Sequence, residues 1–265
     1  MKSILAFGAA AVLLLSTLAQ AKVQTQVIEY KIGDDAFEGY LAFDDAVAGK
    51  RPGVVVYHDW MGVGPYVKGR CDQLAALGYV AFAGDMYGKG LRPADAKEAS
   101  QMAGKAKADR KTMRARAAKA LEVLRTQPQV DASKVAAMGY CFGGTTSLEL
   151  ARSGADVAGV ISFHGGLETP IPAAAGAVKA RVLALHGADD PYVPDKEVAA
   201  FEAEMRTSGA DWQLVKYGGS VHSFTHAGAG TDNSKGAAYN EKADKRSWQA
   251  MKDFFTELFG PPAPK

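Results

Sequence analysis

The stretch that decides the fold is "VAAMGYCFGGTTSLELA", residues 135–151, which joins an apolar run, a cysteine among glycines and a helical pattern. Gly139, Cys141 and Gly143 match the G-x-nucleophile-x-G elbow, with cysteine in the usual place of serine. The flanking residues must be small because strand and helix cross closely at such a turn, and the helix N-terminus favours a thiolate. We therefore predict that Cys141 is a nucleophile and that the N–H of Phe142 faces the developing oxyanion. The alternative is that Cys141 is a small buried hydrophobe.

Strand patterns alternate with helical patterns along the rest of the chain. Such alternation predicts an α/β fold with a mostly parallel sheet and helices on both faces. A predicted hairpin around "GDD" precedes these alternating elements, so we expect an α/β-hydrolase sheet with an N-terminal antiparallel hairpin. The competing prediction is a Rossmann fold, but no G-x-G-x-x-G follows an early strand. The expected hairpin strands are 24–32 and 36–43, the later strands are 52–58, 79–87, 135–140, 157–164, 181–187 and 212–217, and the helices are 67–77, two within 93–125, 144–152, 194–205 and 235–258.

The partners of the nucleophile should follow it in the order acid, then histidine. His222 and His226 both lie beyond the last predicted strand, and His222 is preferred because it is nearer the strand end. Asp189 and Asp190 both follow the strand at 181–187, and position alone does not separate them.

The chain resembles the dienelactone hydrolase family of the α/β-hydrolase superfamily. The resemblance rests on "PGVVVYHDWMGVG", "GYVAFAGDMYGKG", "MGYCFGG", "HGADDPYVP" and "VHSF", which together span most of the chain. It implies a Cys–Asp–His triad that hydrolyses an ester or lactone through a thioester acyl-enzyme. Carried over by position, the triad is Cys141, Asp190 and His222, which separates Asp190 from Asp189.

Two positions depart from the family pattern. Asp59 stands where the family has a glutamate that contacts the resting thiol, so the resemblance implies that Asp59 is a catalytic residue, although it is one methylene shorter. The alternative is that Asp59 is a turn residue or helix cap. Trp60 follows it and is expected to offer the second oxyanion N–H. His226 stands where the family has an arginine that binds the substrate carboxylate, so we expect substrate binding there to differ from that of the namesake enzymes.

Residues 1–21 read as a secretory signal peptide, with Lys2, an apolar stretch and a small-x-small site ending at Ala21. Cleavage there predicts a periplasmic or secreted protein without stable membrane insertion. We expect residues 22–265 to form a single domain. Losing Lys2 lowers the formal charge from +2 to +1, which leaves no strong electrostatic footprint for nucleic acid.

Cys71 lies at core spacing on a predicted helix, and we interpret it as a buried filler. A Cys71–Cys141 disulfide is formally possible after export but would remove the nucleophile. We expect no cofactor and no metal, a small-molecule ester or lactone as the substrate, and a monomer or weak oligomer. Two rival hypotheses remain: a non-catalytic binding protein that keeps the fold, and a redox sensor that uses an exposed thiol.

Overall fold

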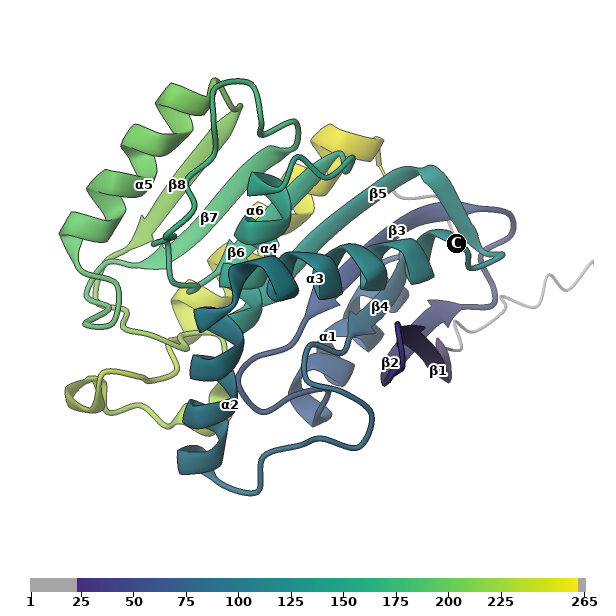
Figure 1. Cartoon of the computed structure of the whole chain (residues 1–265), viewed down its shortest axis with the longest axis horizontal. Helices are drawn as coiled ribbons and strands as arrows, with labels where there is room; N and C mark the ends of the chain where they lie inside the picture. The colour runs from purple at the N-terminus through teal and green to yellow at the C-terminus, as the bar shows by residue number, and fades with distance from the viewer. Residues whose placement is uncertain (1–22, 262–265) are drawn as a thin grey trace, which may run out of the picture.

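The computed structural model describes residues 23–261, so the predicted signal peptide lies outside the described residues. Eight strands form one sheet in the order β1-β2-β4-β3-β5-β6-β7-β8 (Figure 1). The pairs from β4 through β3, β5, β6 and β7 to β8 are parallel. β1 and β2 form the antiparallel hairpin predicted for the N-terminus, and β2 also pairs antiparallel with β4. The strands are β1 (Val23–Ile32), β2 (Asp35–Asp44), β3 (Arg51–Tyr57), β4 (Val80–Gly84), β5 (Val130–Tyr140), β6 (Gly159–Phe163), β7 (Arg181–Gly187) and β8 (Trp212–Tyr217).

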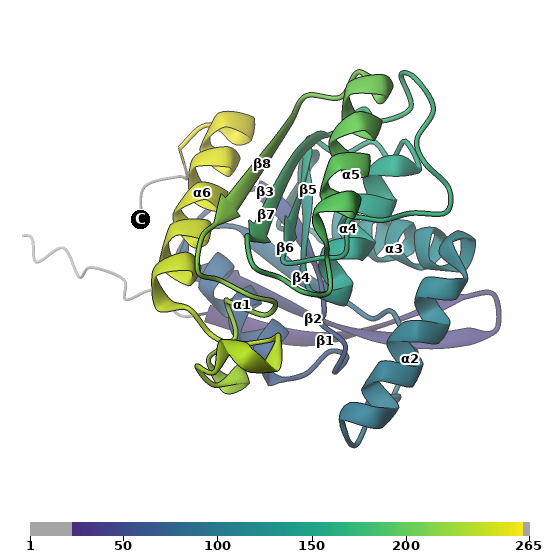
Figure 2. The same cartoon turned by 90° about the vertical axis from the view of Figure 1, so that its left-hand side faces the viewer.

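Helices cover both faces of this sheet, as expected for its apolar strands (Figure 2). One face carries α1 and α6, and the other carries α3, α4 and α5. The helices are α1 (Pro65–Ala76), α2 (Ala96–Ala108), α3 (Arg110–Arg125), α4 (Phe142–Arg152), α5 (Asp195–Ser208) and α6 (Glu241–Phe259). The architecture is the α/β-hydrolase fold that the alternation of strands and helices predicted.

Two helical boundaries have clear local causes. The predicted break within 93–125 falls at Asp109, whose carboxylate accepts a hydrogen bond from the N–H of Thr112 and caps α3. The final helix does not begin at residue 235, as the sequence pattern suggested. It begins at Glu241, because the side chain of Asn240 caps it by accepting from the N–H of Ala243.

The core consists of two apolar layers, one on each side of the sheet. Val55, Phe82 and Met113 belong to the layer under α3 and α4, while Val56, Leu74 and Phe255 belong to the layer under α1 and α6. Among residues 23–261, no helix is both long and apolar enough to cross a bilayer. The rigid sheet places the loops after β3, β5, β6, β7 and β8 at one edge, where ligands of open α/β sheets usually bind.

Candidate active site

Cys141 occupies the sharp turn between β5 and α4. Its backbone has φ 55° and ψ −116°, a left-handed conformation that is strained for a residue with a side chain. One backbone and one side-chain acceptor hold the turn: the N–H of Cys141 faces the carbonyl of Phe163 at 3.0 Å and the ring Nδ1 of His164 at 3.2 Å. The thiol is only partly buried, so the turn presents it at the edge of the sheet.

The glycines around Cys141 are required by close backbone approaches. A Cβ on Gly139 would collide with the backbone of Gly143, and a Cβ on Gly143 would collide with the carbonyl of Tyr57 on β3. Only glycine lets β5 and α4 approach each other and β3 this closely. This is the reason for the glycines that their spacing in the sequence predicted.

His222 and Asp190 lie next to the thiol. His222 Nε2 lies 3.0 Å from Cys141 Sγ, and His222 Nδ1 lies 2.8 Å from Asp190 Oδ2. The other carboxylate oxygen of Asp190 accepts from the N–H of Tyr192 at 2.9 Å. Asp190 is buried, whereas Asp189 is exposed, so the structure and the family pattern select the same aspartate.

The charges of its neighbours dominate the pKa of His222. Burial by itself lowers that pKa, but the negative charge of Cys141 and the hydrogen bond to Asp190 act in the opposite direction. Together they raise the pKa of His222 to about 10. In its protonated form the ring of His222 can donate from Nε2–H to the sulfur of Cys141 and from Nδ1–H to Asp190.

His164 is a further buried residue at this site, and the sequence analysis did not select it. Its Nδ1 accepts from the N–H of Cys141, so Nε2 carries the proton and donates to Thr225 Oγ1 at 2.7 Å. Burial first, and then the positive charges of His222 and Arg70, lower the pKa of His164 well below its usual value. The only sequence signal was its position directly after a strand, a place it shares with many inert residues.

The loop after β3 brings Asp59 and Trp60 to the site. The buried Asp59 carboxylate accepts from the N–H of Met61 at 2.8 Å, and burial raises the pKa of this carboxyl. Within the described part of the chain, no hydrogen bond joins Asp59 to the thiol, so the carboxylate shapes the turn. The Trp60 carbonyl accepts from the hydroxyl of Tyr87 at 3.0 Å, which ties this loop to the loop after β4.

His226 lines the same cavity as Cys141. Its ring stacks on Tyr66 with ring centroids 4.4 Å apart. Tyr66 in turn contacts Thr225 through its hydroxyl, at 2.6 Å from Thr225 Oγ1. His226 is thus part of a packed aromatic wall, in the position where the family pattern expects an arginine.

Two cavities meet at Cys141. The smaller has a volume of about 290 Å³ and the larger about 520 Å³. Both are lined by Cys141, Trp60, Ser223 and Ala237. The nucleophile therefore stands at a junction between two spaces, not at the end of one.

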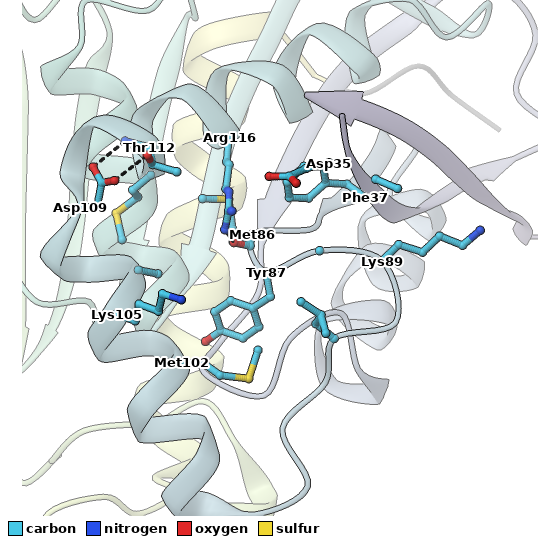
Figure 3. A pocket seen from close by; sticks show the side chains of 15 residues that line it. Asp35, Phe37, Met86, Tyr87, Lys89, Met102, Lys105, Asp109, Thr112 and Arg116 are labelled. Carbon is cyan, nitrogen blue, oxygen red and sulfur yellow. Dashed lines mark hydrogen bonds between the residues drawn. The ribbon is translucent and has the colours of Figure 1, made fainter. Parts of the chain in front are cut away.

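A third cavity of about 580 Å³ lies between the start of β2, the loop after β4, and the helices α2 and α3 (Figure 3). It shares no lining residue with the two cavities at Cys141. Tyr87 lines it, and its ring packs on Phe142 at a centroid distance of 5.5 Å.

Residues 23–261 contain no group of three or more His, Cys, Asp or Glu side chains that could hold a metal ion.

The second cysteine is in a different environment. Cys71 is fully buried on α1, and burial raises the pKa of its thiol well above the usual value. Both thiols are free, so the Cys71–Cys141 disulfide is not formed. This agrees with the interpretation of Cys71 as a core residue.

Comparisons with known proteins agree with this geometry. The profile of the dienelactone hydrolase family matches residues 37–259. The crystal structure of a "dienelactone hydrolase-like promiscuous phosphotriesterase" from metagenomic libraries is 42% identical, covers 91% of this chain and 100% of its own, and has a TM-score of 0.85. A solved structure titled "m3DLH" is 40% identical, covers 89% of this chain and 99% of its own, and has the same TM-score of 0.85.

Among curated proteins, a Bradyrhizobium sp. protein named "Probable 2-oxo-3-(5-oxofuran-2-ylidene)propanoate lactonase" is 29% identical over 196 residues, which is 70% of this chain and 77% of its own. Thermogutta terrifontis esterase 2 is 21% identical, with a TM-score of 0.61 over 91% of this chain and 96% of its own, and shares the fold. The chain belongs to the dienelactone hydrolase family of the α/β-hydrolase superfamily and is a hydrolase of esters or lactones.

Proposed function

We propose that the chain is an exported cysteine hydrolase that cleaves a carboxylic ester or lactone through a thioester acyl-enzyme. The observation that carries the proposal is the continuous arrangement of Cys141, His222 and Asp190, joined by contacts of 3.0 and 2.8 Å at the edge of the sheet. An activated thiol beside an oriented imidazole is the arrangement that nucleophilic catalysis needs.

In acylation, the thiolate of Cys141 attacks the carbonyl carbon, and a C–S bond forms as the carbonyl π electrons move to oxygen. The N–H groups of Phe142 and Trp60 are proposed to bind this oxyanion. Phe142 is the first residue of α4, so its N–H has no acceptor within the helix. Collapse of the intermediate breaks the C–O bond, and the leaving oxygen takes the proton from His222 Nε2.

In deacylation, His222 acts as a base instead of an acid, because acylation removes the charge on sulfur. Once the sulfur is acylated, the thiolate charge that raised the pKa of His222 is gone, and that pKa falls. Neutral His222 then takes a proton from water, and the hydroxide attacks the thioester carbonyl. Collapse breaks the C–S bond and restores the thiolate–imidazolium pair, while Asp190 keeps the imidazole oriented throughout.

The nucleophile is tested by trapping the acyl-enzyme. The mature chain is mixed with 4-nitrophenyl acetate and quenched in acid, and its peptides are analysed by mass spectrometry. We expect a burst of nitrophenolate and one acetyl group on the peptide that contains Cys141. Acetylation of another residue during productive turnover would refute the assignment of the nucleophile.

The same preparation separates the enzyme from its rivals. A non-catalytic binding protein would turn over no ester and would react slowly with iodoacetamide at pH 6. A redox sensor would react rapidly with iodoacetamide but would still turn over no ester. The proposed enzyme does both.

Export is proposed from the sequence of residues 1–21 alone. The full chain is expressed in a Gram-negative host and its periplasmic fraction is collected. N-terminal sequencing should begin at Lys22, directly after Ala21. A full-length chain in the cytoplasmic fraction would contradict this part of the proposal.

A further inference from the structure

The two cavities at Cys141 differ in the functional groups that reach them. His222 and Phe142 line only the larger cavity. Asp59, Tyr66 and His226 line the smaller cavity and not the larger. The groups assigned to proton delivery and to oxyanion binding at the elbow therefore open toward one of the two spaces.

This asymmetry determines the orientation of a bound ester. The leaving oxygen must lie within hydrogen-bond reach of His222 Nε2 when the C–O bond breaks, because it takes its proton there. The acyl chain is attached to the same carbon and points away from the leaving oxygen. With the leaving group on the side of His222, the remaining space beside Cys141 is the smaller cavity.

We propose, building on the function proposed above, that the larger cavity binds the leaving alcohol and the smaller cavity binds the acyl group. The substrates favoured by this site are esters of short, uncharged acids with bulky apolar or aromatic alcohols. This assignment concerns substrate selection and is separate from the identity of the nucleophile.

Volume supports the assignment of a short acid. A space of about 290 Å³ lies just below the range of about 300–1,000 Å³ that is usual for pockets of drug-sized ligands. Its walls are also rigid, since Tyr66 and His226 stack on each other and the hydroxyl of Tyr66 is tied to Thr225. A separate cavity of about 680 Å³ also borders Asp59, Tyr66 and His226. To reach it, a long acyl chain would have to pass these packed rings.

The chemistry of the walls supports the rest of the substrate class. Among the described residues that line the smaller cavity there is the buried Asp59 but no Lys or Arg, so a carboxylate on the acyl group would lose its hydration without gaining a lysine or arginine partner. The walls of the larger cavity combine apolar and aromatic side chains, including Ala103, Val193 and Tyr192, with the polar Lys107 and Thr145. Its volume of about 520 Å³ accommodates an aromatic ring system.

Two substrate series separate the cavities. In the first, the leaving group stays 4-nitrophenolate and the acyl chain grows from acetate through butanoate to octanoate. In the second, acetate stays constant and the alcohol grows from phenol to 1-naphthol, whose leaving-group reactivities are close. We expect kcat/KM to fall by about tenfold or more between butanoate and octanoate, and not to fall from phenyl to naphthyl acetate.

Matched variants locate each effect. Ala229→Phe lies on the wall of the smaller cavity alone, and Ser100→Phe lies on that of the larger alone, both at positions that are not buried. Ala229→Phe should lower the butanoate-to-acetate ratio of kcat/KM by about tenfold and leave the naphthyl-to-phenyl ratio unchanged. Ser100→Phe should do the reverse.

The reverse pattern, with Ala229→Phe acting on the alcohol series and Ser100→Phe on the acyl series, would overturn the assignment. So would a wild-type enzyme that prefers octanoate to acetate. A wild-type protein that hydrolyses none of these esters would refute the proposed function instead. Circular dichroism of both variants shows whether a loss of rate reflects unfolding.

Discussion

Two histidines in this site lie close together, yet their pKa values are shifted in opposite directions. The rings of His164 and His222 are 5.3 Å apart, edge to face, and both are largely enclosed by protein. The pKa of His222 is raised to about 10, while that of His164 is held well below its usual value. Burial acts the same way on both, so the difference comes from their partners.

The partners differ in charge. His222 faces the sulfur of Cys141 and the carboxylate of Asp190, and negative charge at these two groups raises its pKa. His164 faces only a backbone N–H and a threonine hydroxyl, with the positive charges of His222 and Arg70 nearby. One ring is thus suited to carry a proton to the substrate, and the other is suited to remain neutral and support the backbone of the nucleophile.

Removing the thiol should have the largest effect. We expect Cys141→Ala to abolish ester turnover, with a loss on the order of 10⁵-fold or more in kcat, because the covalent step is gone. The pKa of His222 should fall at the same time, since the charge of Cys141 is the largest factor that raises it. NMR titration of the imidazole checks this, and an unchanged pKa near 10 would show that Asp190 alone sets it.

The second largest effect is expected for Asp190→Asn. An amide at this position no longer stabilises the imidazolium and permits the wrong tautomer of His222. We expect kcat to fall on the order of 10³–10⁴-fold, with a smaller change in KM. Asp189→Asn is the matched control because its side chain is exposed, and a loss of similar size in that control would contradict the assignment of the acid.

Stability should depend on pH through His222. The folded pKa of about 10 exceeds the ordinary value of 6.5, so between these values His222 is protonated in the folded chain and neutral in the unfolded chain. The stabilisation from this group is complete below about 6.5 and is lost as the pH rises toward 10. Where the proton on His222 comes from Cys141, the total number of bound protons is equal in both states until the unfolded thiol titrates at about pH 8.5. Urea midpoints measured between about pH 8.5 and 10 should therefore fall more steeply for the wild type than for His222→Asn, and parallel curves would exclude this linkage.

The smallest effect tests the role of His164 through its partner. Thr225→Val removes the hydroxyl that accepts from His164 Nε2 while keeping the shape of the side chain. The variant loses the hydrogen bonds of this hydroxyl to His164 and to Tyr66, each worth about 1 kcal/mol. Because only the bond to His164 bears on the backbone of Cys141, we expect kcat to fall by about fivefold with the fold intact. Thr225→Ser should restore the rate, and iodoacetamide labelling of Cys141 should follow the same order. A Thr225→Val enzyme with wild-type values in both assays would show that this contact does not position the nucleophile.

Local patterns in the sequence predicted much of this molecule. The hairpin, the alternation of strands and helices, and the glycines around Cys141 are all properties of short stretches. His222 could be predicted because the order of nucleophile, acid and histidine follows from the topology of the fold. The boundary of the last helix was wrong by several residues, since the helical pattern continued upstream of the cap at Asn240.

The amino-acid sequence by itself thus determined the fold, the elbow and the class of chemistry, because backbone sterics and hydrophobic periodicity act over a few residues. Only the tertiary structure showed that Asp190 contacts His222 and that Asp59 accepts a hydrogen bond within its own turn. The structure further showed that His164 accepts a hydrogen bond from the backbone of the elbow. It also showed the two cavities of unequal size that meet at Cys141. These features depend on contacts between segments far apart in the chain, and the charge of each buried group depends on the neighbours that such contacts supply.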